Sequence, residues 1–223
     1  MTEKTLLLLA SNSPRRRQLL SLSGWMFNVS VPNVDETLLP DEAPAEYVLR
    51  LARSKVQAAA HFAHRDQIVI AADTTVVDGN TILGKPADLS EATAMLRRLR
   101  GRTHQVYTGL AVLRLADHTL LSDLCITAVP MRAYTDEEIE AYVQSGDPLD
   151  KAGAYAIQHP GFQPVESMSG CYASVMGLPL CHLIRLLRQL ELQPMTDLPK
   201  NCQTFLSYSC PVSARILHGE QVG

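Results

Sequence analysis

The chain has 223 residues, of which 46% are hydrophobic and 19% are charged, and its formal net charge is -3. This composition excludes a globally disordered chain, and the mildly acidic balance argues against stable nucleic-acid binding, which needs a strongly basic face. Its apolar runs are far shorter than the roughly 20 residues of a membrane span, so we expect no membrane association.

The first predicted unit is a strand, a turn and a helix. The apolar residues 6–10 predict a short buried strand, and residues 18–22 continue an amphipathic helix. Between them, Ser13 suits the N-cap and Pro14 suits the first helical position. The free N–H groups of this helix end, its dipole and the arginines at 15–17 favour a phosphate group. The alternative is a capped surface helix with solvated arginines.

Strand and helix patterns alternate along the rest of the chain. Apolar or alternating runs predict further strands at residues 27–31, 68–72, 75–77, 81–83, 106–115 and 120–129. Amphipathic runs predict helices from Asp41 or Pro44 to His64, from the N-cap Ser90 to Leu99, from the capping box of Thr135 and Glu138 to Ser145, and over 178–190. A hairpin turn is predicted at 78–80. Together these elements predict an α/β fold with a mixed, twisted sheet and flanking helices.

The C-terminal part of the chain differs from the rest. Residues 1–196 contain all of the predicted elements and are expected to form one domain, whereas residues 197–223 lack clear periodicity. We expect this C-terminal tail to be poorly ordered. The five cysteines are scattered without a CxxC pair, which favours reduced thiols and a cytoplasmic setting.

Two polar residues lie beside these apolar runs. Asp73 directly follows the run 68–72, so we expect it at the end of a strand, where α/β proteins place ligands. Its carboxylate can bind a hard cation or accept a proton from water, or it caps a turn. Lys55 lies on or beside the apolar stripe of the helix 44–64, and it either reaches water or points into a cleft.

Residues 79–85 fit the first seven positions of the phosphate-binding loop GxxxxGK, but Pro86 replaces the Ser or Thr that follows. Proline offers neither a hydroxyl for Mg²⁺ nor an N–H, so we exclude an ATPase. Lys85 is then a point charge for a phosphate or a solvated turn lysine. His104 has no accompanying nucleophile elbow, which argues against a hydrolase triad. Gln158 either reads the edge of a base or is an ordinary loop amide.

Taken together, segments in the same order from about residue 6 to 192 resemble the Maf family of nucleoside triphosphate pyrophosphatases. The resemblance implies two lobes around a cleft and a fold related to the inosine triphosphate pyrophosphatases. It also implies hydrolysis to the monophosphate and pyrophosphate with a divalent cation, Mg²⁺ or Mn²⁺. The matching segments are Ser11–Arg16, Asp35-Glu36, Lys55, Ala72-Asp73-Thr74, Gly84-Lys85-Pro86, Gly101–Gly109, Asp150–Gly153, Ile157-Gln158 and Val175–Pro179.

The same resemblance implies roles for individual residues. Asp73 matches the general base, and Asp73 and Glu36 match the acidic groups linked to the metal. Arg, Thr and Gln at the positions linked to substrate choice resemble the branch acting on dTTP and UTP. The implied catalytic residues are Asp73, Glu36 and Lys85, and the implied substrate-binding residues are Ser11, Arg15, Arg16, Lys55, Thr74 and Gln158. One departure is His159-Pro160-Gly161, where the family often has Gly directly after Gln158.

Other functions remain open at this stage. One is a pyrophosphatase that prefers 7-methylguanosine triphosphate, and another is a nucleotide-binding regulator of division or septum formation with little turnover. The carboxylates favour an enzyme, because a pure polyphosphate binder gains little from negative charge beside its ligand. A dinucleotide-dependent oxidoreductase is disfavoured, because no G-x-G-x-x-G follows the first strand. The sequence leaves a homodimer open.

Overall fold

The fold is built around a mixed β-sheet. The computed structural model describes residues 7–223, so Leu6, the start of the first predicted strand, lies outside the described residues. The sheet has the order β2-β1-β3-β5-β6, with β4 paired to β3. β1 is parallel to β2 and β3, and the remaining pairs are antiparallel, which confirms the predicted mixed sheet. The strands are β1 (Leu7–Ala10), β2 (Phe27–Ser30), β3 (Ile68–Asp78), β4 (Thr81–Leu83), β5 (Thr103–Arg114) and β6 (Thr119–Pro130).

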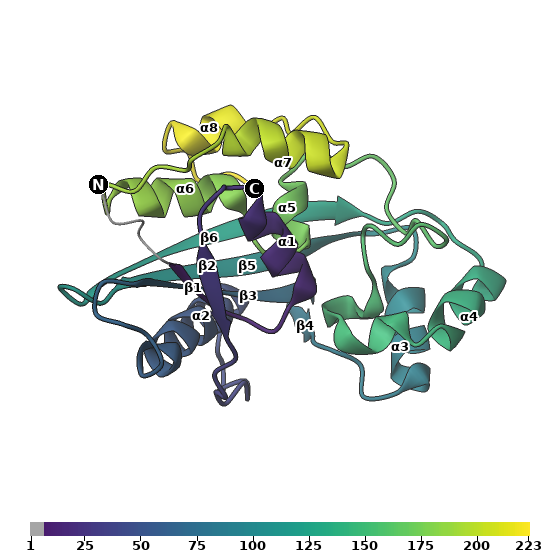
Figure 1. The fold of residues 1–223 in the computed structure, drawn as a ribbon. Coiled ribbons are helices and arrows are strands. Elements are labelled where there is room, and N and C mark those ends of the chain that lie inside the picture. The colour runs from purple at the N-terminus through teal and green to yellow at the C-terminus, as the bar shows by residue number, and fades with distance from the viewer. Residues whose placement is uncertain (1–6) are drawn as a thin grey trace.

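Helices flank both faces of the sheet (Figure 1). α2 packs on one face, whereas α1, α5 and α6 contribute to the apolar core on the other face. Each helix within residues 7–223 is too short or too polar to cross a bilayer. The helices are α1 (Pro14–Ser21), α2 (Pro44–Ala60), α3 (Leu89–Leu99), α4 (Asp136–Gln144), the 3-10 turns η1 (Asp147–Asp150) and η2 (Ala152–Ala154), α5 (Tyr172–Val175), α6 (Leu180–Arg188), α7 (Leu198–Leu206) and α8 (Ser213–Leu217).

Side chains alternate between the two faces along β3, and this alternation positions the polar residues that follow. Ile70 and Ala72 belong to the core beneath α1 and α6, whereas Val69 and Ala71 pack against α2. The alternation continues in the next two residues, so the side chain of Asp73 faces α2 and that of Thr74 faces α1. The strand therefore presents a carboxylate to one layer of helices and a hydroxyl to the other.

A smaller lobe stands at the far end of β3, β5 and β6. Figure 1 shows α3 and α4 in this lobe, beyond the end of the sheet. Its apolar residues form a separate cluster with the strand ends, and the members include Val76, Leu96, Val106, Val129 and Tyr134. The chain thus folds as two lobes, and β3 runs from one into the other.

Several local predictions are confirmed. The hairpin between β3 and β4 has Gly79 in the left-handed region at its turn, with φ of 62°. Thr135 and Glu138 form the capping box at the start of α4. The buried face of α2 consists of the predicted stripe of Val48, Leu51, Ala52, Val56 and Ala59.

Two local predictions were wrong. Residues 68–78 form one strand, so Asp73 lies inside β3, opposite Gly109 of β5, and not at a strand end. β3 continues because β5 pairs with it along almost its whole length, a long-range contact that the local pattern does not reveal. The N-cap of α3 is Asp88 instead of Ser90, because the Asp88 carboxylate accepts from the N–H of Glu91 at 2.8 Å.

The structure also corrects the expectation of a poorly ordered C-terminal tail. Residues 197–223 contain α7 and α8, and Leu198, Val212 and Ile216 are buried in the main core. Figure 1 shows both helices lying over α6. Each helix is short, so its apolar residues are too few to produce a visible period, and tertiary packing stabilises it.

Candidate active site

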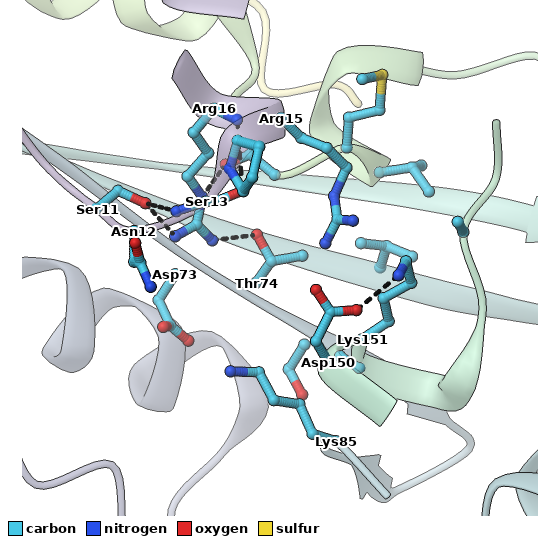
Figure 2. Close-up of a pocket in the computed structure, with 18 of the residues that line it drawn as sticks. Ser11, Asn12, Ser13, Arg15, Arg16, Asp73, Thr74, Lys85, Asp150 and Lys151 are labelled. Carbon is cyan, nitrogen blue, oxygen red and sulfur yellow. Dashed lines mark hydrogen bonds and ion pairs between the residues drawn. The ribbon is translucent and has the colours of Figure 1, made fainter. Parts of the chain in front are cut away.

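A cavity of about 780 Å³ lies where β1 ends beside β3. This volume is in the range that ligands of nucleotide size occupy. All nine predicted site residues line it, together with Asn12, Tyr47, Asp150, Lys151 and Tyr155, which sequence reasoning did not assign. Figure 2 shows ten of the lining residues by name, contributed by segments that are far apart in the sequence.

The topology explains why these segments meet. β1 lies between β2 and β3, and the chain leaves it through α1 to β2 and returns through α2 to β3. Helices on opposite faces diverge at such a switch in strand order, which leaves a crevice at the carboxyl end of the strand. β1 ends at Ala10, whereas β3 continues past it, so Asp73 and Thr74 border this crevice.

The turn after β1 forms one wall of the cavity. Ser13 caps α1 by accepting from the N–H of Arg16, as predicted. Ser11 Oγ accepts from the N–H of Ser13 at 3.1 Å and from Nη1 of Arg16 at 3.4 Å. Because both contacts use Ser11 as an acceptor, its hydroxyl hydrogen is available to a bound anion.

Arg16 is held by several acceptors on that wall. Its Nε donates to the carbonyl oxygen of Gly177 at 2.8 Å, and its Nη2 donates to Thr74 Oγ1 at 3.1 Å. Burial lowers the pKa of Arg16, and the charge of Asp73 opposes this effect. The guanidinium is thus fixed in one orientation beside the cavity.

Two hydrogen-bonded hydroxyl groups, those of Thr74 and Thr108, form a relay that holds Arg16. The buried Thr108 donates to the carbonyl oxygen of Ser174 at 2.9 Å, so its oxygen can only accept from Thr74, 3.0 Å away. The Thr74 hydroxyl therefore donates its hydrogen to Thr108 and accepts a hydrogen bond from Arg16. In this arrangement Thr74 holds Arg16 in place and can meet a substrate only as an acceptor.

The two predicted acidic residues share one cation. Lys55 places Nζ 2.5 Å from Oδ1 of Asp73 and 2.6 Å from Oε1 of Glu36, and 13% of its side chain is exposed. Of the two alternatives for Lys55, the structure shows the one in which it points into the cavity. Burial raises the pKa of Asp73, opposed by the charges of Lys55 and Arg16. Burial also acts to raise the pKa of Glu36, but Lys55, together with the charges of Lys85 and Arg16, outweighs it and the net shift is downward.

The acidic pair has the chemistry that a hard cation needs. Mg²⁺ is commonly bound through one or two carboxylates, with water and substrate phosphates completing its octahedron. Oδ2 of Asp73 and Oε2 of Glu36 have no hydrogen-bond partner in the described part of the chain, so each carboxylate keeps a free oxygen. The structure shows no group of three or more His, Cys, Asp or Glu suited to a metal within residues 7–223.

Two further cations face the cavity without an ion-pair partner among the residues described. Lys85 follows the hairpin of β3 and β4, and Figure 2 shows its side chain reaching toward Asp73. Arg15 comes from the first turn of α1, and its guanidinium points toward Asp150 in the same view. No helix begins directly after Lys85, so the segment lacks the strand-to-helix geometry of an ATPase phosphate loop.

The residues on the opposite wall come from the segment after η1. Gln158 lies there, and Lys151 and Tyr155 lie deeper in the same segment. His104 does not line the cavity. Its Nε2 contacts the Tyr155 hydroxyl at 2.8 Å, and burial lowers the pKa of His104 to about 4. His104 is thus a neutral buried partner of Tyr155. Lys151 forms an ion pair with Asp147 at 2.9 Å, and their spacing of four residues is a local pattern that favours such a pair.

Comparison with known proteins identifies the family. A sequence model of the family described as "Maf-like protein" matches residues 6–190. A dTTP/UTP pyrophosphatase of Hahella chejuensis is 42% identical over 193 residues, which cover 86% of this chain and 95% of the relative. One of Myxococcus xanthus is 48% identical over 187 residues, covering 84% and 93%. A solved dITP/XTP pyrophosphatase of Mycobacterium abscessus is 14% identical with a TM-score of 0.40, covering 83% of this chain and 98% of that one. The chain belongs to the Maf family.

Proposed function

We propose that this protein hydrolyses dTTP and UTP to the monophosphate and pyrophosphate. The observation that carries the proposal is the convergence of cationic side chains and carboxylates on one cavity of nucleotide size. Among them are Arg15, Arg16, Lys55, Lys85, Asp73 and Glu36. Relatives that are 42% and 48% identical over most of this chain are dTTP/UTP pyrophosphatases, which supports the choice of substrates.

The leaving group determines what the cations do. Water attacks the α-phosphorus, the bond from that phosphorus to the bridging oxygen breaks, and pyrophosphate departs with the electron pair. Negative charge therefore develops on the pyrophosphate, and fixed cations near it stabilise the transition state. Arg16 is already oriented by Gly177 and Thr74, whereas Arg15 and Lys85 line the cavity without an ion-pair partner within residues 7–223 and can bind the phosphates.

Asp73 is the proposed base that takes the proton of the attacking water. Its Oδ1 is bound to Lys55, which leaves Oδ2 to accept the proton. Burial raises the pKa of Asp73, so the carboxylate is a stronger base than an exposed one. A divalent cation held by Asp73 and Glu36 would supply Lewis acidity to the water and neutralise phosphate charge.

A substrate panel tests this proposal. Purified protein is incubated with UTP, dTTP, CTP, GTP and 7-methylguanosine triphosphate, with Mg²⁺ or with a chelator, and pyrophosphate is measured. We expect release from UTP and dTTP in the presence of Mg²⁺ and little with the chelator. A preference for 7-methylguanosine triphosphate would overturn the choice of substrate. Nucleotide binding without release from any member of the panel would instead identify a binding regulator.

A further inference from the structure

The segment that carries Gln158 is anchored by a chain of hydrogen bonds behind the cavity wall. Lys151 Nζ donates to the carbonyl oxygen of Asp147 at 2.5 Å, to its Oδ1 at 2.9 Å and to Asp150 Oδ1 at 2.6 Å. Oδ2 of Asp147 accepts from the hydroxyl of Tyr142 at 2.6 Å. That hydroxyl accepts in turn from the N–H of Ala156 at 3.0 Å. Tyr142 therefore joins the start of the segment to a point two residues before Gln158.

Tyr142 belongs to α4 in the smaller lobe and does not line the cavity. Its side chain is buried, and its ring stacks on Phe162 with centroids 4.4 Å apart and planes inclined by 12°. The ring also contacts the imidazole of His159 edge-on, with centroids 4.7 Å apart. These aromatic contacts and the packing of Tyr142 in the core of the smaller lobe fix the ring and thereby the position of its hydroxyl.

The first half of the segment is also fixed to the loop of Lys85. The N–H of Gly153 donates to the carbonyl oxygen of Gly84 at 3.0 Å. Gly153 has φ of 68°, and a Cβ at this position would come within 2.8 Å of a Val76 methyl carbon, so the backbone has little room to shift there. With Gly153 fixed, the contact of Tyr155 with His104 and the hydrogen bond of Ala156 to Tyr142 hold residues 154–158 in place, and the second lies nearer to Gln158.

We propose that Tyr142 is a positioning residue that sets the geometry of the segment bearing Gln158 and thereby the choice of nucleobase. This inference rests on the proposed function, because it concerns how the same cavity recognises its substrate. Tyr142 acts through the N–H of Ala156, with Asp147 orienting the tyrosine hydroxyl, and it touches neither substrate nor the reacting atoms.

Three of the groups proposed to hold the triphosphate come from other parts of the fold. Arg16, Lys55 and Asp73 belong to α1, α2 and β3, and none of them contacts Tyr142. Loss of the Tyr142 hydroxyl should therefore weaken base recognition and leave the chemical step nearly intact. Tyr142→Phe is a suitable variant, because it keeps the ring stack on Phe162 and leaves only the N–H of Ala156 and the carboxylate of Asp147 without their partner.

Tyr134→Phe is a matched control. Tyr134 is also a buried tyrosine of the smaller lobe, and its ring lies 4.8 Å from that of Phe162. Its hydroxyl donates to the carbonyl oxygen of Leu96 at 2.8 Å and has no contact with the segment 151–158. A general loss of packing or stability in this lobe would affect both variants, whereas a positioning role would affect only Tyr142→Phe.

The experiment compares UTP with CTP in four proteins, the wild type, Tyr142→Phe, Gln158→Ala and their double mutant, with Tyr134→Phe as the control. We expect Tyr142→Phe to raise KM for UTP about 10-fold with kcat changed less than about 2-fold, and to reduce the UTP preference over CTP. The double mutant should lose no more selectivity than Gln158→Ala alone, because residues that act in series are not additive.

Calorimetric titration of UTP and CTP gives a second readout that does not require turnover. Three outcomes would each overturn the positioning role. They are an unchanged UTP preference over CTP in Tyr142→Phe, an equal change of this preference in Tyr134→Phe, and additive losses of the preference in the double mutant. A wild type that binds UTP selectively but releases no pyrophosphate would overturn the proposed function alone, since binding selectivity still tests Tyr142. A wild type that prefers neither nucleotide in either assay would overturn both.

Discussion

The ammonium of Lys55 lies 2.5 Å from Oδ1 of Asp73, and the same nitrogen lies 2.6 Å from Oε1 of Glu36. A side-chain cation therefore stands between the two carboxylates that are proposed to hold a divalent metal. A metal bound through Oδ2 of Asp73 and Oε2 of Glu36 would lie close to this ammonium, and repulsion between the two positive charges opposes its binding. Phosphate groups of the substrate would offset both charges, so metal and nucleotide should bind more tightly together than separately.

Lys55→Met should strengthen metal binding in the absence of nucleotide. Removing the competing ammonium is expected to lower the Kd for Mn²⁺ about 10-fold or more, and titration followed by electron paramagnetic resonance measures it directly. Lys85→Met is the control, because it removes the same charge from the same cavity without a contact to either carboxylate. Equal gains in both variants would show a general electrostatic effect and would contradict a specific competition between Lys55 and the metal.

Asp73→Asn should abolish most pyrophosphate release while retaining the fold. The amide cannot take the proton of the attacking water, and loss of a general base lowers kcat by about 10²- to 10⁴-fold. Steady-state kinetics with UTP measures the loss, and an unchanged melting temperature shows that the fold persists. Asp117→Asn, in the exposed turn between β5 and β6, is the control for removal of a carboxylate. Undiminished turnover in Asp73→Asn would exclude Asp73 as the base.

Local patterns predicted this site only in part. The stripe of α2 placed Lys55 beside the buried face, and the capping pattern of Ser13 and Pro14 placed the arginines at a helix start, because both depend on neighbours within a few residues. The same reasoning placed Asp73 at a strand end, because the pairing that extends β3 comes from β5, more than thirty residues away. The hydroxyl relay through Thr108 and the anchor at Tyr142 also depend on contacts between residues far apart in the sequence, so no local pattern predicts them.

Residues 197–223 lie beyond the part of the chain that matches the family, and they should contribute measurably to stability. Ile216 of α8 is fully buried in the main core, whereas Phe205 of α7 is 47% exposed. Ile216→Ala is expected to reduce the free energy of unfolding by about 2–5 kcal/mol, because it leaves a cavity. Phe205→Ala should change it by less than about 1 kcal/mol. Urea denaturation measures both values, and equal small effects would show that α8 is not packed on the core.

The buried His182 should make stability depend on pH. Its Nδ1 lies 3.0 Å from Asp123 Oδ2, and its Nε2 lies 3.0 Å from the carbonyl oxygen of Val222. Burial alone would lower the pKa of His182, but hydrogen bonds to Asp123 and Cys125 outweigh it and raise the pKa to about 9. A raised folded-state pKa stabilises the fold most below the unfolded value of about 6.5, and this stabilisation is lost as the pH rises through 9.

We therefore expect the free energy of unfolding to fall by about 3 kcal/mol between pH 6 and pH 10 because of His182. Urea denaturation at a series of pH values measures this slope. In His182→Asn, which cannot titrate in this range, the slope should be shallower, although the variant is less stable at pH 6. Parallel slopes in the two proteins would show that His182 does not titrate as described.

Thr108→Val tests whether the hydroxyl relay orients Arg16. The substitution keeps the shape of the buried side chain but removes the oxygen to which Thr74 donates, so Thr74 can rotate and Arg16 loses its fixed acceptor. We expect kcat/KM for UTP to fall about 10-fold, since Arg16 is then no longer held for the transition state. Thr127→Val is the control, because Thr127 is a fully buried threonine of β6 whose hydroxyl contacts only the thiol of Cys125 in the described structure. Both variants lose a buried hydroxyl, so we expect comparable losses of stability. If kcat/KM falls as much in Thr127→Val as in Thr108→Val, then packing accounts for the effect and the relay does not.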